Sequence, residues 1–113
     1  MSSKDHYIEI AEKAEDLAKS IKSHDISLRY KDLSQKIKND PDAQIVYERL
    51  VKLGKDIADA KENGTELDES FVLENESLKH DLQKNPLVRE FVDSQKDYFE
   101  MMSFVQKVIS TIS

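Results

Sequence analysis

The chain has 113 residues, 38% of them hydrophobic, which suits a single helical domain over residues 1–113 but leaves little room for a large enclosed pocket. Two glycines and two prolines are too few turn-forming residues for a many-stranded β fold, so the composition predicts an all-α protein. The formal net charge of −6 argues against a general affinity for nucleic acid, because neutralising phosphates requires clustered cations.

The first two predicted helices lie in the first 40 residues. The first begins near Asp5 and runs to about Lys22, and its narrow apolar face is rich in alanine, which allows close approach of another helix. That face consists of Ile8, Ala11, Ala14, Leu17, Ala18 and Ile21. After a break at 23–25, a shorter helix carries apolar residues at helical spacing and ends at Asn39-Asp40.

A third helix starts at Asp40-Pro41, where Asp40 caps the helix and proline occupies the first helical position. Its apolar stripe is formed by Ala43, Val46, Tyr47, Leu50, Leu53, Ile57 and Ala60. The helix ends at Asn63-Gly64, where glycine can adopt the left-handed conformation that closes a helix. Gly54 lies on the stripe, and we expect another helix to cross there.

A fourth helix follows Gly64, with Asp68 and Ser70 as competing caps. Its apolar side carries Leu67, Phe71, Leu78 and Leu82. With the helices on either side, this gives an antiparallel bundle of about five helices, in which the third and fifth are the longest and run antiparallel to each other.

The fifth helix organises the chain. It begins at Asn85-Pro86, a second cap-and-proline start, and its seam steps by three and four residues through Val88, Phe91, Gln95, Tyr98, Met102, Val105, Ile109 and Ile112. One flank of the seam is acidic in the first half and apolar in the second, where Met101, Phe104 and Val108 widen the apolar arc.

A short chain cannot easily cover so wide an apolar arc, so we expect another chain, first of all a second copy, to cover it. The predicted partner or dimer interface is Phe91, Tyr98, Met101, Met102, Phe104, Val105, Val108, Ile109 and Ile112.

No catalytic, metal or cofactor site is predicted. The three histidines, His6, His24 and His80, are scattered, and only Glu76 stands four residues before His80, a spacing better explained as a solvated polar pair. The sequence has no phosphate-binding glycine loop and no nucleophile elbow, and the absence of cysteine excludes thiolate chemistry and disulfides.

Two further charged patterns have simpler explanations. Asp40 and Asp42 flank Pro41 as capping and first-turn residues rather than as catalytic carboxylates. The basic residues of the second helix lack an aromatic platform for RNA, so we interpret them as a solvated face; they are Arg29, Lys31, Lys36 and Lys38. Without a transmembrane stretch or a signal sequence, the expected location is the cytoplasm.

The Asp40-Pro41-Asp42-Ala43 restart, and above all the stretch LQKNPLVREFVDSQ from Leu82 to Gln95 with the apolar helix that follows, resembles the YlbF/YmcA family of small bacterial helical proteins. The stretch from Asn85 through Gln95 is most similar to the YmcA branch. The resemblance implies an all-helical, dimer-forming, cytoplasmic protein with a regulatory role.

In that family, YlbF and YmcA assemble with a third protein, YaaT, and act on competence, sporulation and biofilm formation by promoting RNase Y-dependent maturation of messenger RNA. Some members hold iron–sulfur clusters with added cysteines, and this sequence has none, so cluster binding does not carry over. The resemblance implies paralogous YlbF/YmcA-type proteins or an RNase Y-linked complex as partners.

The first hypothesis is therefore a non-enzymatic interaction protein without a cofactor. The alternatives are a small metal-dependent enzyme, which bound metal at His80 and Glu76 would support, and a nucleic-acid-associated accessory protein, which salt-sensitive RNA binding would support.

Overall fold

The computed structural model describes the backbone of residues 3–112 and the side chains of residues 6–112. Over these residues it contains five α-helices and no strand, which confirms the all-α prediction. The helices are α1 (Ser3–Ser23), α2 (Asp25–Lys38), α3 (Pro41–Asn63), α4 (Glu69–Gln83) and α5 (Pro86–Ile112). As expected, α3 and α5 are the longest, with 23 and 27 residues.

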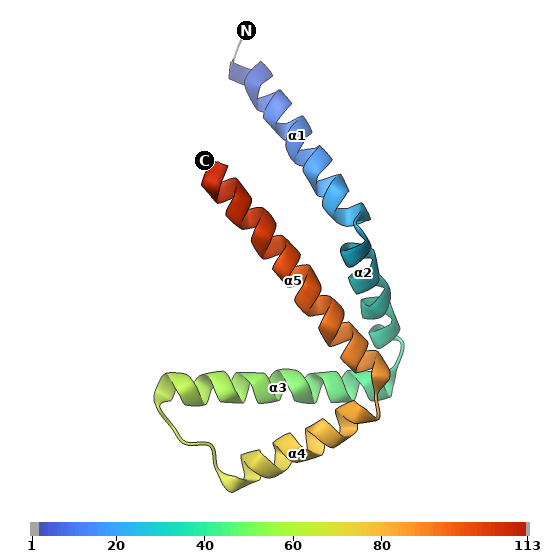
Figure 1. Ribbon diagram of the computed structural model, residues 1–113, viewed down its shortest axis with the longest axis vertical. Coiled ribbons are helices and arrows are strands. Elements are labelled where there is room, and N and C mark those ends of the chain that lie inside the picture. The colour runs from blue at the N-terminus through green and yellow to red at the C-terminus, as the bar shows by residue number, and fades with distance from the viewer. Residues whose placement is uncertain (1–2, 113) are drawn as a thin grey trace.

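The helices form two antiparallel pairs joined at one corner (Figure 1). The first half of α5 packs along α2, and α3 packs along α4. The prediction of an antiparallel helical bundle is confirmed, but the expected antiparallel pairing of α3 with α5 is wrong, because these helices meet only near their starts and then diverge. The radius of gyration is 19.8 Å, against about 13 Å for a compact chain of this size, so the molecule is open and elongated.

Side-chain caps fix the helix starts. Asp40 Oδ1 accepts the N–H of Ala43 at 3.1 Å, and Asn85 Oδ1 accepts the N–H of Val88 at 3.2 Å. Asp68, rather than Ser70, caps α4 by accepting the N–H of Phe71 at 2.9 Å. The predicted left-handed stop of α3 is present at Gly64, with φ of 65°.

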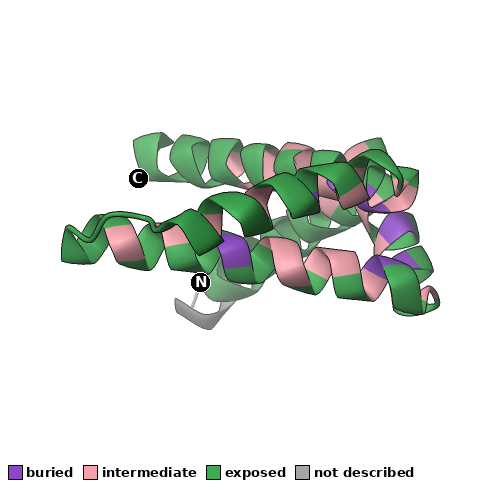
Figure 2. Cartoon of the chain, turned by 90° about the horizontal axis from the view of Figure 1, so that it is seen from below, coloured by how far each residue is buried: buried purple, intermediate pink, exposed green. Residues whose placement is uncertain are grey.

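The main core lies where α2, α3 and α5 meet, and we call this region the joint. Its buried residues are Leu33, Ile37, Ala43, Val88 and Phe91. Tyr47 of α3 packs edge-to-face on Phe91 at 5.1 Å, and its hydroxyl accepts a hydrogen bond from Gln95, the polar member of the α5 seam. Figure 2 shows that most buried residues gather in this one part of the molecule.

The expected helix crossing at Gly54 is wrong. Gly54 is exposed, and a Cβ atom placed there would have no heavy atom of another residue within 4 Å. The physical reason is the divergence of α5 from α3: the side of α3 that carries Ala43, Tyr47 and Gly54 contacts other helices only near its start.

The α3–α4 pair has a smaller apolar contact and an ion-pair network of its own. Leu53 and Leu78 are 7% and 1% exposed. Arg49 of α3 contacts the carboxylates of both Glu74 and Asp81 on α4. The hydrogen bond from Arg49 is the main cause that lowers the pKa of Asp81.

A substitution at Leu78 tests whether the apolar contact between α3 and α4 holds these two helices together. Leu78→Ala should lower the free energy of unfolding by about 2–4 kcal/mol, because it leaves a cavity in a buried contact. Leu73 is the matched control on the same helix, since it is 66% exposed, and Leu73→Ala should change stability by no more than about 0.5 kcal/mol. Urea unfolding followed by circular dichroism measures both values. Equal losses would show that Leu78 is not a core residue.

Asp81 gives a pH-dependent prediction. Its pKa is lower in the folded chain than the ordinary value of 3.8, so the stabilisation is present above about pH 4 and is lost as the pH falls through the folded-state pKa. Asp81→Asn should therefore be less stable than wild type at pH 7, and this difference should shrink as the pH falls below about 4. Thermal unfolding across this range measures the effect, with Asp59→Asn, on an exposed part of α3, as the control. A difference that is independent of pH would contradict the assignment.

Candidate functional site

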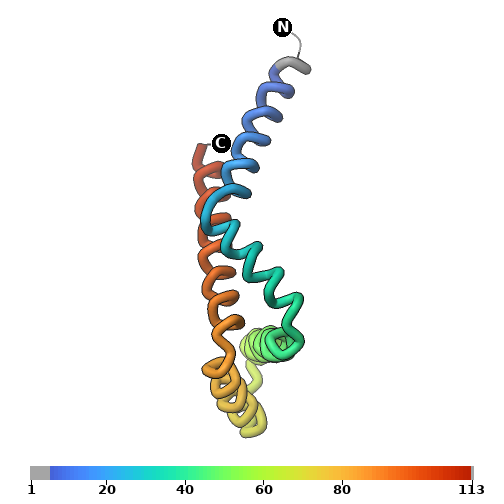
Figure 3. The backbone as a smooth tube through the Cα atoms, turned by 90° about the vertical axis from the view of Figure 1, so that its right-hand side faces the viewer, coloured from blue at the N-terminus to red at the C-terminus, as the bar shows by residue number. Residues whose placement is uncertain are grey.

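Helix α1 continues from the end of α2 that lies away from the joint, on the same side of the molecule as the end of α5, and we call these two segments the arm (Figure 3). Over the described residues, α1 packs against no helix except α2, at their junction. All residues from 6 to 20 are exposed. The second half of α5, residues 98–112, runs on the same side of the molecule, away from α3 and α4.

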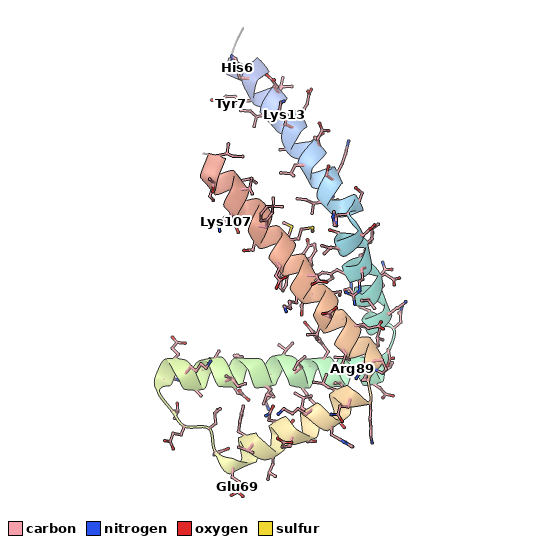
Figure 4. All side chains as sticks on the ribbon, in the orientation of Figure 1. His6, Tyr7, Lys13, Glu69, Arg89 and Lys107 are labelled. Atoms are coloured by element: carbon pink, nitrogen blue, oxygen red, sulfur yellow. The ribbon has the colours of Figure 1, made fainter. Side chains whose placement is uncertain are left out.

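Apolar side chains of α1 are left in solvent. Tyr7 is 69% exposed and Ile10 is 64% exposed, and Ile8 and Leu17 are exposed as well. Figure 4 shows Tyr7 on the side of α1 that faces the end of α5. Most of the stability of a helix in a protein comes from packing of its apolar face, so an apolar contact along α1 would stabilise it.

The structure divides the predicted interface on α5 into two parts. Phe91 does not belong to the surface: it is 5% exposed and lies in the core of the joint, so its assignment to a partner interface is wrong. Tyr98 is partly buried because its ring meets that of Tyr30 edge-on at 4.7 Å. Further along, Met101, Met102 and Val105 are partly buried.

The remaining predicted interface residues are exposed. Phe104 is 67% and Ile112 is 81% exposed, and Val108 and Ile109 are exposed between them. Together with the apolar side chains of α1 they form what we call the arm surface. Its members are Tyr7, Ile8, Ile10, Leu17, Phe104, Val108, Ile109 and Ile112. Large exposed apolar surfaces mark interaction sites in soluble proteins.

The contribution of α1 was missed by the sequence reasoning. The alanine-rich face predicted close packing of α1 against a neighbouring helix, yet no helix of the same chain covers it over the described residues. Two features of the sequence could have indicated this contribution. The first helix has a continuous apolar stripe, and the last helix has an apolar arc too wide for one chain to cover.

Other candidate sites are held in structural contacts. Glu76 pairs with Lys79 at 3.9 Å, and His24 caps α2, with its Nδ1 accepting the N–H of Ile26. No group of three or more histidine and acidic side chains gathers among the described residues in a way that could hold a metal ion. Asp40 serves as the cap of α3, as expected.

A shallow pocket lies between α3 and α4, and the charged residues Arg49, Asp68 and Glu74 in its lining have partners. Arg49 is held by Glu74 and Asp81, and its own pKa is raised mainly by the hydrogen bond to Asp81. The backbone N–H of Phe71 lowers the pKa of Asp68, with a smaller contribution from the Ser70 hydroxyl. These groups fix the ends and spacing of the helices.

None of the helices that the structure describes combines the length and low charge that crossing a membrane requires.

Known proteins are similar to this chain over nearly its whole length. A protein from Lactobacillus gasseri named UPF0342 is 23% identical over 106 residues, which cover 91% of this chain and 88% of that protein. Residues 10–113 match the family described as control of competence regulator ComK, YlbF/YmcA. With nearly the whole chain matched, this protein belongs to the YlbF/YmcA family of competence-control regulators.

Proposed function

We propose that this protein is a non-enzymatic regulatory protein that acts by binding other proteins, including a second copy of itself, through the arm surface. Membership in a family of competence-control regulators supports the regulatory role. The observation that carries the proposal is the uncovered apolar surface shared by α1 and the second half of α5.

The energetic argument rests on the most exposed of these side chains. Fully burying a side chain of the size of Phe104 or Ile112 contributes about 1.5–3 kcal/mol, and both lie mostly in solvent in the isolated chain. Several such residues on one surface give association a driving force large enough to offset the loss of translational freedom. The fold of the joint does not need these residues, because its core is complete without them.

The finer part of the proposal concerns the pathway. We propose that the protein influences competence, sporulation or biofilm formation, and that it does so with paralogous YlbF/YmcA-type proteins or with an RNase Y-linked complex that matures messenger RNA. Family membership is the support for this assignment. The absence of cysteine means that any iron–sulfur chemistry in such a complex would need thiolates from another chain.

A charge at Phe104 tests the association. Phe104→Asp should raise the dissociation constant of the self-associated form by roughly 30-fold or more, because a buried unpaired carboxylate costs about 2 kcal/mol or more. Helical content should stay unchanged, since Phe104 is 67% exposed in the single chain. Light scattering coupled to size-exclusion chromatography measures the mass.

Ser103→Asp is the matched control, because it adds the same charge about 100° further around α5, on its polar side, and should associate as wild type does. A wild-type protein that is monomeric at micromolar concentration, or a Phe104→Asp variant that associates normally, would contradict the proposed interface.

The partner assignment has a separate test. Tagged wild-type protein, purified from the native bacterium, should retain paralogous family members or RNase Y at levels that the Phe104→Asp variant reduces at least about tenfold, since tenfold corresponds to about 1.4 kcal/mol. Quantitative mass spectrometry directed at those named proteins makes the comparison, with Ser103→Asp as the control. Equal recovery with both variants would show that these partners, if bound, use another surface.

A further inference from the structure

A groove runs along α2 beside the arm surface, and we call it the α2 groove. It has a volume of about 600 Å³ and takes its residues from the end of α1, one face of α2, and α5. The residues that matter below are Ile21, Lys22, Ser27, Lys31, Lys38 and Tyr98.

The α2 groove is basic within an acidic protein. Lys22, Lys31 and Lys38 line it, no carboxylate does, and none of the three lysines forms an ion pair with a described residue. The whole sequence, by contrast, carries a net charge of −6. A groove lined by three unpaired lysine side chains favours the binding of an acidic segment.

The groove also has an apolar part and one unsatisfied polar group. Leu28 is 50% exposed along it, and Ile21 and Tyr98 are partly buried. Ser27 is only 9% exposed, and its hydroxyl has no hydrogen-bond partner. A buried hydroxyl without a partner is unfavourable, so a polar group of an occupant that reached it would be stabilising.

The groove borders the two helices that carry the arm surface. Ile21 belongs to the apolar stripe of α1 and Tyr98 to the seam of α5, and both also line the groove. Whatever covers the arm surface would therefore lie next to the three lysines.

The first half of α1 has the chemistry that the groove requires. Between residues 6 and 16 it carries four acidic residues against one lysine, whereas residues 19–38 carry six basic residues against two acidic ones. Glu9 and Asp16 stand seven residues apart on one face of α1, and Lys31 and Lys38 stand seven residues apart on α2. Both pairs are therefore separated by about 10.5 Å along their helices.

The order of these charges fits a two-fold, antiparallel arrangement. Helices α1 and α2 follow each other end to end with only His24 between them (Figure 1). A two-fold axis through this junction would place Glu9 level with Lys38 of a second copy, and Asp16 level with Lys31. The same axis would place Lys22 level with Asp25.

We propose that the α2 groove receives the acidic first half of α1 from a second copy of this chain, in an antiparallel, two-fold arrangement. This inference rests on the proposed self-association and adds to it the orientation of the two copies. In this arrangement the basic face of α2, which the sequence analysis interpreted as a solvated face, lies in the interface of the same dimer that covers the arm surface. Each contact occurs twice, because a two-fold interface repeats every pair.

Reciprocal charge reversal tests the proposal. The variant Lys31→Glu/Lys38→Glu and the variant Glu9→Lys/Asp16→Lys should each raise the dissociation constant of the homodimer roughly tenfold or more at low salt, since both copies of the contact become repulsive. An equimolar mixture of the two variants should form a heterodimer with nearly wild-type affinity. The acidic groove of the lysine variant then meets the basic α1 of the other variant, and the unchanged groove of that variant meets the unchanged α1 of the lysine variant. Analytical ultracentrifugation with one variant fluorescently labelled measures all three affinities.

Lys55→Glu/Lys61→Glu is the matched control for the lysine variant. It makes the same change in net charge as that variant, but on exposed residues of α3, away from the groove. It should leave the dissociation constant within about threefold of wild type, since exposed charges far from an interface are screened at moderate salt.

The outcomes separate this inference from the proposed function. If wild type associates and Phe104→Asp does not, but the reversed variants behave like the α3 control or fail to recover on mixing, the antiparallel arrangement is overturned and the interface on the arm surface stands. If wild type is a monomer, self-association itself fails. If the lysine variant dimerises normally and instead loses salt-sensitive binding to a single-stranded oligonucleotide, the groove serves nucleic acid and the proposal is overturned.

Discussion

The fold depends on two helix starts that turn the chain at the same place. Asp40 and Asn85 each precede a proline, and each accepts the N–H of the residue three positions on. Those two residues, Ala43 and Val88, are completely buried, and both belong to the core of the joint. The caps therefore fix both where α3 and α5 begin and which of their residues enter the core.

A small buried residue of α5, Ser94, lies beside α2. Ser94 is 1% exposed on α5, and its hydroxyl donates to the carbonyl of Phe91 within its own helix, so no partner from α2 is needed. Rings of Tyr30, Phe91 and Tyr98 pack edge-on beside it. The ion pairs of Arg29 with Asp93 and Asp97 lie on the exposed rim and add little stability.

The seam of α5 serves two purposes along its length. In its first half, Val88 and Phe91 complete the core of the joint. Near its end, Ile109 and Ile112 are exposed. One continuous apolar pattern therefore holds the fold at one end, and the proposal gives its other end to a partner. The charges on α1 and α2 add orientation to this apolar attraction, since apolar burial is not directional and charge pairs are.

Local chemistry let the sequence determine the starts of α3 and α5 and the end of α3. A cap followed by proline marks the starts of α3 and α5, and Gly64 with its positive φ marks the end of α3, because each signal acts within a few residues of chain. The widening of the apolar arc at Met101, Phe104 and Val108 likewise predicted that the second half of α5 is not fully covered by its own chain. Four of the predicted interface residues there are exposed, namely Phe104, Val108, Ile109 and Ile112.

The tertiary structure alone decided which helices meet. Phe91 and Phe104 share an apolar arc in the sequence, yet the first is buried against α2 and α3 while the second is exposed, because α5 leaves the joint between them. Gly54 lies in solvent for the same reason. The tyrosines beside the α2 lysines come from two helices, Tyr30 on α2 and Tyr98 on α5, and only the packing of those helices brings them together. Helical periodicity defines the face that each helix buries, but the angle at which two helices leave a joint depends on contacts between distant residues, and that angle decides whether the face meets its own chain or solvent.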